Sequence, residues 1–98
     1  MNISRCILAR KRGATDFNCM FQHDAYHENY EAICRLARQW GATDFDTMLE
    51  SAAFDDVESL CRLAKEWGAT DFNRMLDSAT KGKNEALCTL AHEWGATN

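Results

Sequence analysis

The amino-acid sequence predicts an all-α fold, a short solenoid of stacked helical hairpins. Three observations predict it: a phrase containing Gly-Ala-Thr recurs, each repeat holds two stretches with helical apolar spacing, and a glycine follows each second stretch. The recurring glycines are spaced 28, 27 and 27 residues apart, at Gly13, Gly41, Gly68 and Gly95. A constant period of this size is typical of a stacked repeat array.

The 98 residues are expected to form one repeat domain without a linker. Its parts are an N-terminal capping helix, three repeats and a C-terminal tail, at residues 1–12, 13–40, 41–67, 68–94 and 95–98. With two helices in each repeat, the prediction is seven helices in all. Because a pair of such short helices cannot bury its apolar face alone, each repeat must cover its neighbour.

Repeat two shows both helical faces. The apolar residues of its first half follow the i, i+3, i+4, i+7 spacing of one buried face: Phe45, Met48, Leu49 and Ala52. Those of its second half line one face in the same way: Leu60, Cys61, Leu63, Ala64 and Trp67. We therefore expect both helices to pack against the same core.

The ends of these helices also have sequence signals. Thr43 is the expected N-cap, and Asp44 places negative charge on the first turn, where the helix dipole favours it. The junction glycines stand where a helix ends and the chain needs a left-handed residue. The turns inside the hairpins are expected at Asp55-Asp56 and at Gly82-Lys83.

Composition narrows the class of protein. With 46% hydrophobic and 27% charged residues, the chain reads as globular, and no apolar run approaches the roughly 20 residues that span a bilayer. The N-terminus lacks the features of a signal peptide.

Four of the five cysteines occupy the same position in the repeated segment: Cys6, Cys34, Cys61 and Cys88. Neighbouring helices lie about 8–10 Å apart, too far for a disulfide, so we expect reduced thiols and an intracellular protein.

The repeat resembles a known family. Ser51-Ala52-Ala53, then Glu58, then the run from Leu60 to Ala69 are similar to the two helices of an ankyrin repeat, and Gly82 and Glu85 add to the likeness. The WGATDF wording resembles the short ankyrin-like repeats of giant DNA viruses of the marseillevirus type. The resemblance implies a non-catalytic protein–protein interaction module that acts on host or viral proteins, with the host cytoplasm as its expected location.

The chain also departs from that family. An ankyrin repeat has about 33 residues, whereas these have 27 or 28, and the Thr-Pro-Leu-His signature is missing. The missing residues correspond to the β-hairpin finger between repeats. We therefore expect ankyrin-like repeats without β-hairpin fingers, joined by Gly-Ala-Thr alone. A tetratricopeptide unit, with 34 residues, fits less well.

The partner-binding surface is predicted from differences between the copies. Residues that all copies share are explained by stacking, so residues that vary on the first helices and the following turns are candidates for binding. We expect the partner to contact Gln22, Tyr26, His27, Tyr30, Glu50, Phe54 and Asp55. Aromatic residues at exposed turns resemble binding anchors. The alternative is that Tyr26 and Phe54 only staple their own hairpins.

Metal binding is a further hypothesis. Cys19, His23 and His27 follow i, i+4, i+8 spacing and could present sulfur and two imidazoles to zinc from one helical face. No fourth ligand is evident, and the other repeats carry Thr47, Ser51 and Asp55 there, as expected of a solvated surface. The sequence therefore favours a protein without a metal or other cofactor.

A basic N-terminus provides the alternative function. Arg5, Arg10, Lys11 and Arg12 give residues 1–13 a charge of +4, so the remainder carries −8 within the net charge of −4. Such a patch could associate with nucleic acid. It could also be the polar outer face that a terminal repeat needs for solubility, which we favour because four charges neutralise few phosphates.

Two stripes run through the repeats. Trp40, Trp67 and Trp94 could stack on bases or peptides, but packing of each ring against the next repeat explains their recurrence. The second stripe, Asp16, Asp44 and Asp71, is explained by negative charge at the N-termini of helices.

The sequence shows no nucleophile with its base, no phosphate-binding loop and no pair of catalytic acids. We therefore expect that this protein is not an enzyme.

Two points concern the end repeats. Any self-association is expected at the C-terminal end, where Ala53, Phe54 and Val57 are replaced by Thr80, Lys81 and Asn84. This polarity predicts a monomer or a weak homodimer.

In repeat one, Asp24 aligns with a position that faces the core in the other repeats. Either a cap arginine such as Arg5 pairs with it, or the extra residue of repeat one shifts the helix register.

Overall fold

Every regular element in the described part of the chain is a helix in the computed structural model. The structure describes residues 7–8, 10–13, 17–22 and 29–97, and no strand occurs among them. Its elements are the 3-10 helix η1 (Asn18–Gln22) and the α-helices α2 (Tyr30–Gln39), α3 (Phe45–Phe54), α4 (Glu58–Glu66), α5 (Phe72–Lys81) and α6 (Glu85–Glu93). The prediction of an all-α fold is thus confirmed for these residues.

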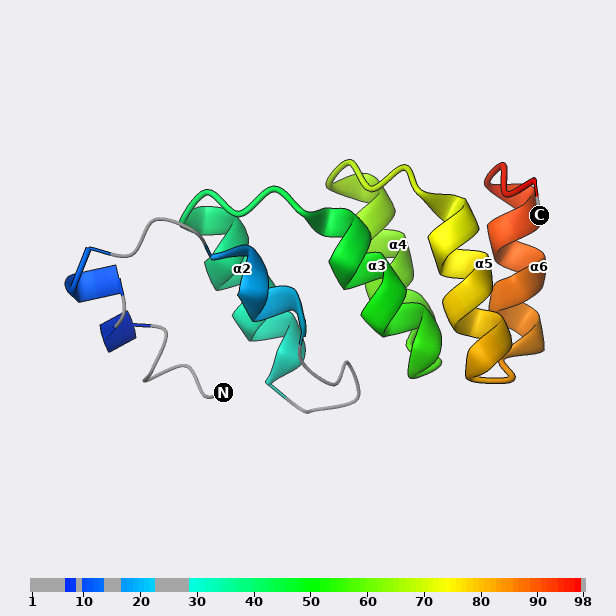
Figure 1. The fold of residues 1–98 in the computed structure, drawn as a ribbon, viewed down its shortest axis with the longest axis horizontal. Helices are drawn as coiled ribbons and strands as arrows, with labels where there is room; N and C mark the ends of the chain where they lie inside the picture. The colour runs from blue at the N-terminus through cyan, green and yellow to red at the C-terminus, as the bar shows by residue number, and fades with distance from the viewer. Residues whose placement is uncertain (1–6, 9, 14–16, 23–28, 98) are drawn as a thin grey trace.

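The helices pair and then pack side by side (Figure 1). Helices α3 and α4 form one hairpin, α5 and α6 form the next, and the two hairpins meet chiefly through α3 and α5. Element η1 packs against both α2 and α3. The molecule is elongated, with principal dimensions of 42 × 22 × 17 Å. A chain of neighbour contacts along one axis is the arrangement that a repeated apolar face favours.

The predicted apolar faces make most of the core. In α3, Met48, Leu49 and Ala52 are fully buried, and in α4 Leu60, Cys61 and Ala64 are buried. Leu63 differs from the prediction because it is only partly buried at the edge of the core. Phe45 and Trp67 also lie at this edge, where they are half-buried. The helical period identified the correct faces, but it did not distinguish their centre from their rim.

The Gly-Ala junctions close each second helix. Gly41 has a φ of +101°, a left-handed conformation that costs glycine little. Its N–H donates to the carbonyl of Arg38 at 3.0 Å, and the N–H of Ala42 donates to the carbonyl of Ala37 at 2.9 Å. These two bonds satisfy carbonyls that a helix end leaves without partners. The same geometry recurs at Gly68 and Gly95.

The turns inside the hairpins use the same closure, but the residue in the left-handed conformation is not a glycine. Asp56 and Lys83 each have a φ of +59°, and they lie in the two turns that the sequence predicted. The N–H of Val57 donates to the carbonyl of Ala52 at 2.9 Å, which turns the chain sharply toward α4. A non-glycine residue in the left-handed region is strained, so the hairpin packing must offset this cost.

The helix caps correct the sequence assignment by one residue. Asp44, not Thr43, is the N-cap of α3, and its Oδ1 accepts a hydrogen bond from the N–H of Thr47 at 3.2 Å. Asp71 caps α5 in the same way. Thr43 lies too early because the helix begins at Phe45. The aspartate stripe therefore consists, at these two positions, of capping groups rather than first-turn charges.

Candidate interaction surface

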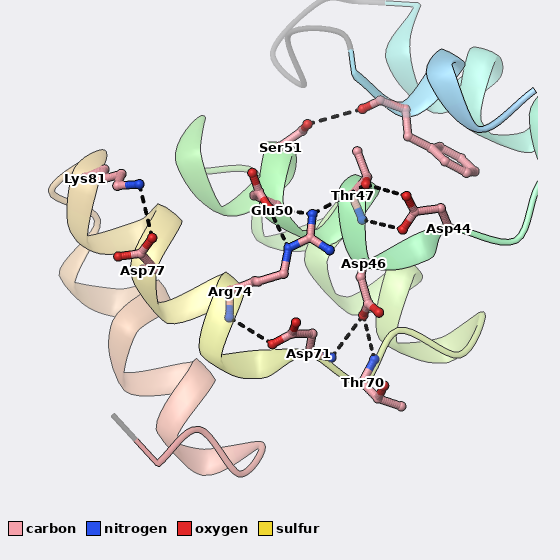
Figure 2. A network of polar contacts seen from close by, with 11 residues as sticks. Asp44, Asp46, Thr47, Glu50, Ser51, Thr70, Asp71, Arg74, Asp77 and Lys81 are labelled. Atoms are coloured by element: carbon pink, nitrogen blue, oxygen red, sulfur yellow. Dashed lines mark hydrogen bonds and ion pairs between the residues drawn. The ribbon is translucent and has the colours of Figure 1, made fainter.

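The outward side of the first helices carries a polar network that links α3 to α5 (Figure 2). Both Nε and Nη2 of Arg74 lie 2.7 Å from Oε2 of Glu50. Nη2 also lies 3.5 Å from Oγ1 of Thr47. The bond to Glu50 raises the pKa of Arg74. Because both partners are more than two-fifths exposed, the pair contributes modestly to stability and mainly orients the two side chains.

A second set of contacts ties each first helix to the next junction. Oδ1 of Asp46 accepts hydrogen bonds from the N–H groups of Thr70 and Asp71, both at 2.9 Å. Asn18 makes the equivalent bonds to Thr43 and Asp44 at 2.9 and 3.0 Å, and Asn73 makes one to Thr97 at 2.8 Å. Sequence reasoning missed these clamps. The available signal was the small Asn or Asp after each Phe, at the repeat spacing.

Phe54 is the predicted anchor that the structure places on the surface. It is the last residue of α3 and 52% exposed, the most exposed large apolar residue in the described part of the chain. Its backbone is nevertheless held, because Nδ2 of Asn84 donates to the carbonyls of Ala53 at 2.7 Å and Phe54 at 3.0 Å. Gly82 also packs closely on the Phe54 carbonyl. An exposed ring on a held backbone is a suitable anchor.

The neighbours of Phe54 are acidic. Glu50 lies one turn earlier on α3, and Asp55 follows as the C-cap of the helix. In repeat three, the residue that corresponds to Phe54 is Lys81, whose Nζ pairs with Asp77 at 3.1 Å. The aromatic and acidic surface is thus particular to repeat two among the described residues.

Tyr30 corrects the prediction of the binding surface. Its side chain is fully buried, and its hydroxyl donates to the carbonyl of Phe21 at 2.7 Å. Burial raises the pKa of the hydroxyl well above its usual range. In this structure Tyr30 is a core residue, because the start of α2 faces η1 rather than solvent. We therefore leave it out of the surface.

Several of the predicted site residues fall outside the part of the chain that the structure describes. Tyr26 and His27 lie outside the described residues, and so does His23 of the zinc hypothesis. Gln22 and Cys19 belong to η1, but only their backbone is described. Elsewhere in the described chain, no group of three or more His, Cys, Asp or Glu side chains is arranged to hold a metal ion. Asp24 also lies outside the described residues.

No family model, curated protein or solved structure matched this chain when it was compared with known proteins. The likeness to ankyrin repeats therefore stays an expectation from the residues quoted above. No helix in the described ranges is both long and apolar enough to cross a membrane.

The tryptophan stripe is occupied by contacts within the chain. Trp67 has the Phe45 ring at a centroid distance of 5.6 Å, and the Arg38 guanidinium lies 4.9 Å from the Trp67 centroid. Trp94 is enclosed similarly by Phe72 and Lys65. Each ring thus packs between its own first helix and a cation of the preceding repeat. This arrangement favours the structural explanation over a stacking platform for bases.

The basic residues near the N-terminus are exposed. Arg10, Lys11 and Arg12 all face solvent, and Arg5 lies outside the described residues. The Arg10 guanidinium lies 5.0 Å from the Trp40 ring centroid. At least one of these cations therefore belongs to the same cation–tryptophan series as Arg38.

The cysteines of the second helices are core residues. Cys34 and Cys61 are free and fully buried. Burial raises the pKa of each thiol to about 12. Since the thiolate is the reactive form, these two residues are poor nucleophiles and poor metal ligands at neutral pH.

Proposed function

We propose that the chain is a non-catalytic protein-binding module, built from ankyrin-like helical hairpins that lack β-hairpin fingers. The exposure of Phe54 carries this proposal. An apolar side chain that remains half-exposed on an ordered helix gains free energy when a partner covers it. The stacked hairpins of α3–α4 and α5–α6 supply the rigid support that a binding surface needs.

The proposed surface consists of Glu50, Phe54 and Asp55 on α3 and its following turn. When the repeats are aligned with one another, the residues of repeat one that correspond to these three are Gln22, Tyr26 and His27. They extend the proposed surface toward repeat one. The aromatic ring is the expected anchor. The carboxylate of Asp55 beside it favours a partner with Lys or Arg next to an apolar pocket, whereas Glu50 already pairs with Arg74. The likeness to viral ankyrin-type repeats adds the proposal that this partner is a host or viral protein met in the host cytoplasm.

The test is affinity capture from infected cells, followed by quantitative mass spectrometry. Three purified proteins serve as bait: the wild type, Phe54→Lys and Ala86→Lys. We expect a partner that the wild type captures to be lost with Phe54→Lys, which introduces the residue found at the corresponding position of repeat three. Ala86→Lys on the exposed side of α6 is the matched control and should retain it. Both variants should melt close to the wild type. Retention by Phe54→Lys would remove the basis for this surface.

The second candidate function is nucleic-acid association through Arg10, Lys11 and Arg12, and their exposure supports it. Filter binding to duplex DNA and single-stranded RNA at several salt concentrations tests it. Phosphate binding predicts affinity that falls steeply with salt and falls further on charge removal. We favour the protein-binding function because the remaining chain is strongly acidic and repels phosphate.

A further inference from the structure

Three exposed cations form a row along the stack of repeats. Arg10, Arg38 and Lys65 each stand three residues before a junction glycine. Each lies over the tryptophan ring of the following repeat, at 5.0, 4.9 and 5.4 Å from the ring centroid. We call these three residues the cation row. Because each contact joins one repeat to the next, the row follows the stacking direction.

The row has no carboxylate partner in the part of the chain that the structure describes. The ion pairs of α2 and α4 go to a different arginine of each helix: Arg35 pairs with Glu31 at 3.2 Å, and Arg62 pairs with Glu58 at 3.0 Å. The other ion pairs join residues of α3 and α5. Helices α2 and α4 thus each present one cation that is paired and one that is not.

The two cations of each helix gather beside one ring. Arg35 lies 5.7 Å from the Trp67 centroid, and Arg38 lies 4.9 Å from it. Residues three apart on a helix are neighbours, so two guanidinium groups share the single carboxylate of Glu31. The same arrangement recurs at Trp94. The helix dipole accounts for a cation in the last turn, but not for the second one, and an added anion would balance the pair.

The tryptophans restrain the row. Trp67 and Trp94 are half-buried, and each packs against a phenylalanine ring at a centroid distance of 5.6 Å. A long cationic side chain that rests on such a ring has less freedom to lose when it binds an anion, while its N–H groups stay available. The row is therefore partly ordered for binding in advance.

The spacing of the row defines its ligand. Equivalent residues of stacked helices lie about 8–10 Å apart. An extended or polyproline-type peptide covers about 9–10 Å in three residues. Carboxylates at every third residue of such a peptide would meet successive cations of the row.

Nearby acidic residues exclude a more densely charged ligand. Glu66 follows Lys65 directly and is exposed. A continuous phosphate backbone would bring negative charge against it, whereas a peptide places uncharged residues between its carboxylates. The charge pattern thus favours an acidic peptide over nucleic acid.

We propose that the cation row of Arg10, Arg38 and Lys65 binds an extended acidic segment of another polypeptide, with a carboxylate at about every third residue. This site is separate from the Phe54 surface. It gives the chain a second binding surface, on the second helices.

The test uses a fluorescent peptide with three glutamates separated by pairs of prolines, and a control peptide of the same composition with the glutamates consecutive. Anisotropy titration at low salt should give a Kd on the order of 100 µM for the spaced peptide, about two- to fivefold tighter than for the control. Added salt should weaken binding. In ¹⁵N-labelled protein, the indole N–H signals of Trp67 and Trp94 should shift. Equal binding of the two peptides, or unchanged indole signals, overturns the proposal.

Matched variants separate the row from net charge. The double change Arg38→Gln, Lys65→Gln keeps the side-chain stems and should weaken binding about fivefold or more. The control Lys81→Gln, Lys83→Gln removes the same charge at the turn between α5 and α6, the opposite end of the hairpin, and should bind normally. Equal losses in the two variants would reduce the effect to net charge and contradict the proposal.

Two further measurements identify the ligand class and the surface. A single-stranded oligonucleotide of equal charge should bind more weakly than the spaced peptide, and tighter binding that the row variant abolishes would assign the row to phosphate instead. Phe54→Lys should bind the spaced peptide normally. Failure of the cation row therefore leaves the proposed function of the Phe54 surface intact, and the reverse also holds.

Discussion

Oδ1 of Asp46 accepts a hydrogen bond from the backbone N–H of Thr70 at 2.9 Å, although 24 residues separate the two in the chain. The same oxygen also accepts from the N–H of Asp71 at 2.9 Å. One carboxylate therefore joins the first turn of α3 to the junction before α5. The position recurs as Asn18 and Asn73, so the clamp is a repeated part of the stacking geometry.

Removal of this clamp should loosen the contact between hairpins. Asp46→Ala leaves two N–H groups without their acceptor, and we expect the free energy of unfolding to fall by about 1–2 kcal/mol. Asp46→Asn is the control that the chain itself offers, since Asn provides the same oxygen at the other two positions. It should remain within about 0.5 kcal/mol of the wild type. Urea melts followed by circular dichroism measure both, and equal losses would show that charge, not the acceptor, matters.

The left-handed residue between α5 and α6 predicts a stabilising substitution. Lys83 has a φ of +59°, which is strained for an L-residue with a side chain. Lys83→Gly should raise the free energy of unfolding by up to about 1 kcal/mol, because glycine adopts this conformation at little steric cost. Lys81→Gly, inside the last turn of α5, should be destabilising instead. A lower melting temperature for Lys83→Gly would contradict the assigned turn.

Two leucines of α4 separate the centre of the core from its edge. Leu60 is only 5% exposed, so Leu60→Ala should cost about 2–5 kcal/mol, the usual range for truncation of a buried leucine. Leu63 is partly buried at the rim, and Leu63→Ala should cost clearly less, about 1–2 kcal/mol. Chemical denaturation of the two variants in parallel checks the order. The reverse order would mean that α4 is rotated relative to the core.

The buried thiols make stability depend on alkaline pH. Burial raises the pKa of Cys34 and Cys61 from 9.0 to about 12, so the folded protein holds these protons more tightly than the unfolded chain. Their contribution is fully present below pH 9 and is lost as pH rises toward 12. The slope is up to about 1.4 kcal/mol per pH unit for each thiol.

Urea melts between pH 8 and 11 measure this dependence. The double variant Cys34→Ala, Cys61→Ala should be less stable at pH 8 because it loses packing, but its stability should decline less steeply with pH than that of the wild type. Parallel curves for the two proteins would show that the thiols do not titrate in the folded state as expected.

The sequence alone determined the period, the helical class and the apolar faces. These features are local: helical spacing groups Met48, Leu49 and Ala52 on one side of a helix whatever lies next to it. The turn positions at Asp56 and Lys83 and the glycine-terminated helices followed from the conformational needs of single residues. Residues close in sequence were therefore predicted well, apart from the N-cap, which lay one residue later than expected.

Only the tertiary structure decided which residues meet across repeats. The clamp by Asp46, the burial of Tyr30 and the rim position of Leu63 depend on how far one helix stands from another, and periodicity carries no such distance. Asn84 shows the same limit, because its polar side chain turns inward to the preceding hairpin rather than toward solvent. The pattern within a helix specifies a face, whereas exposure and partners are properties of the space between helices.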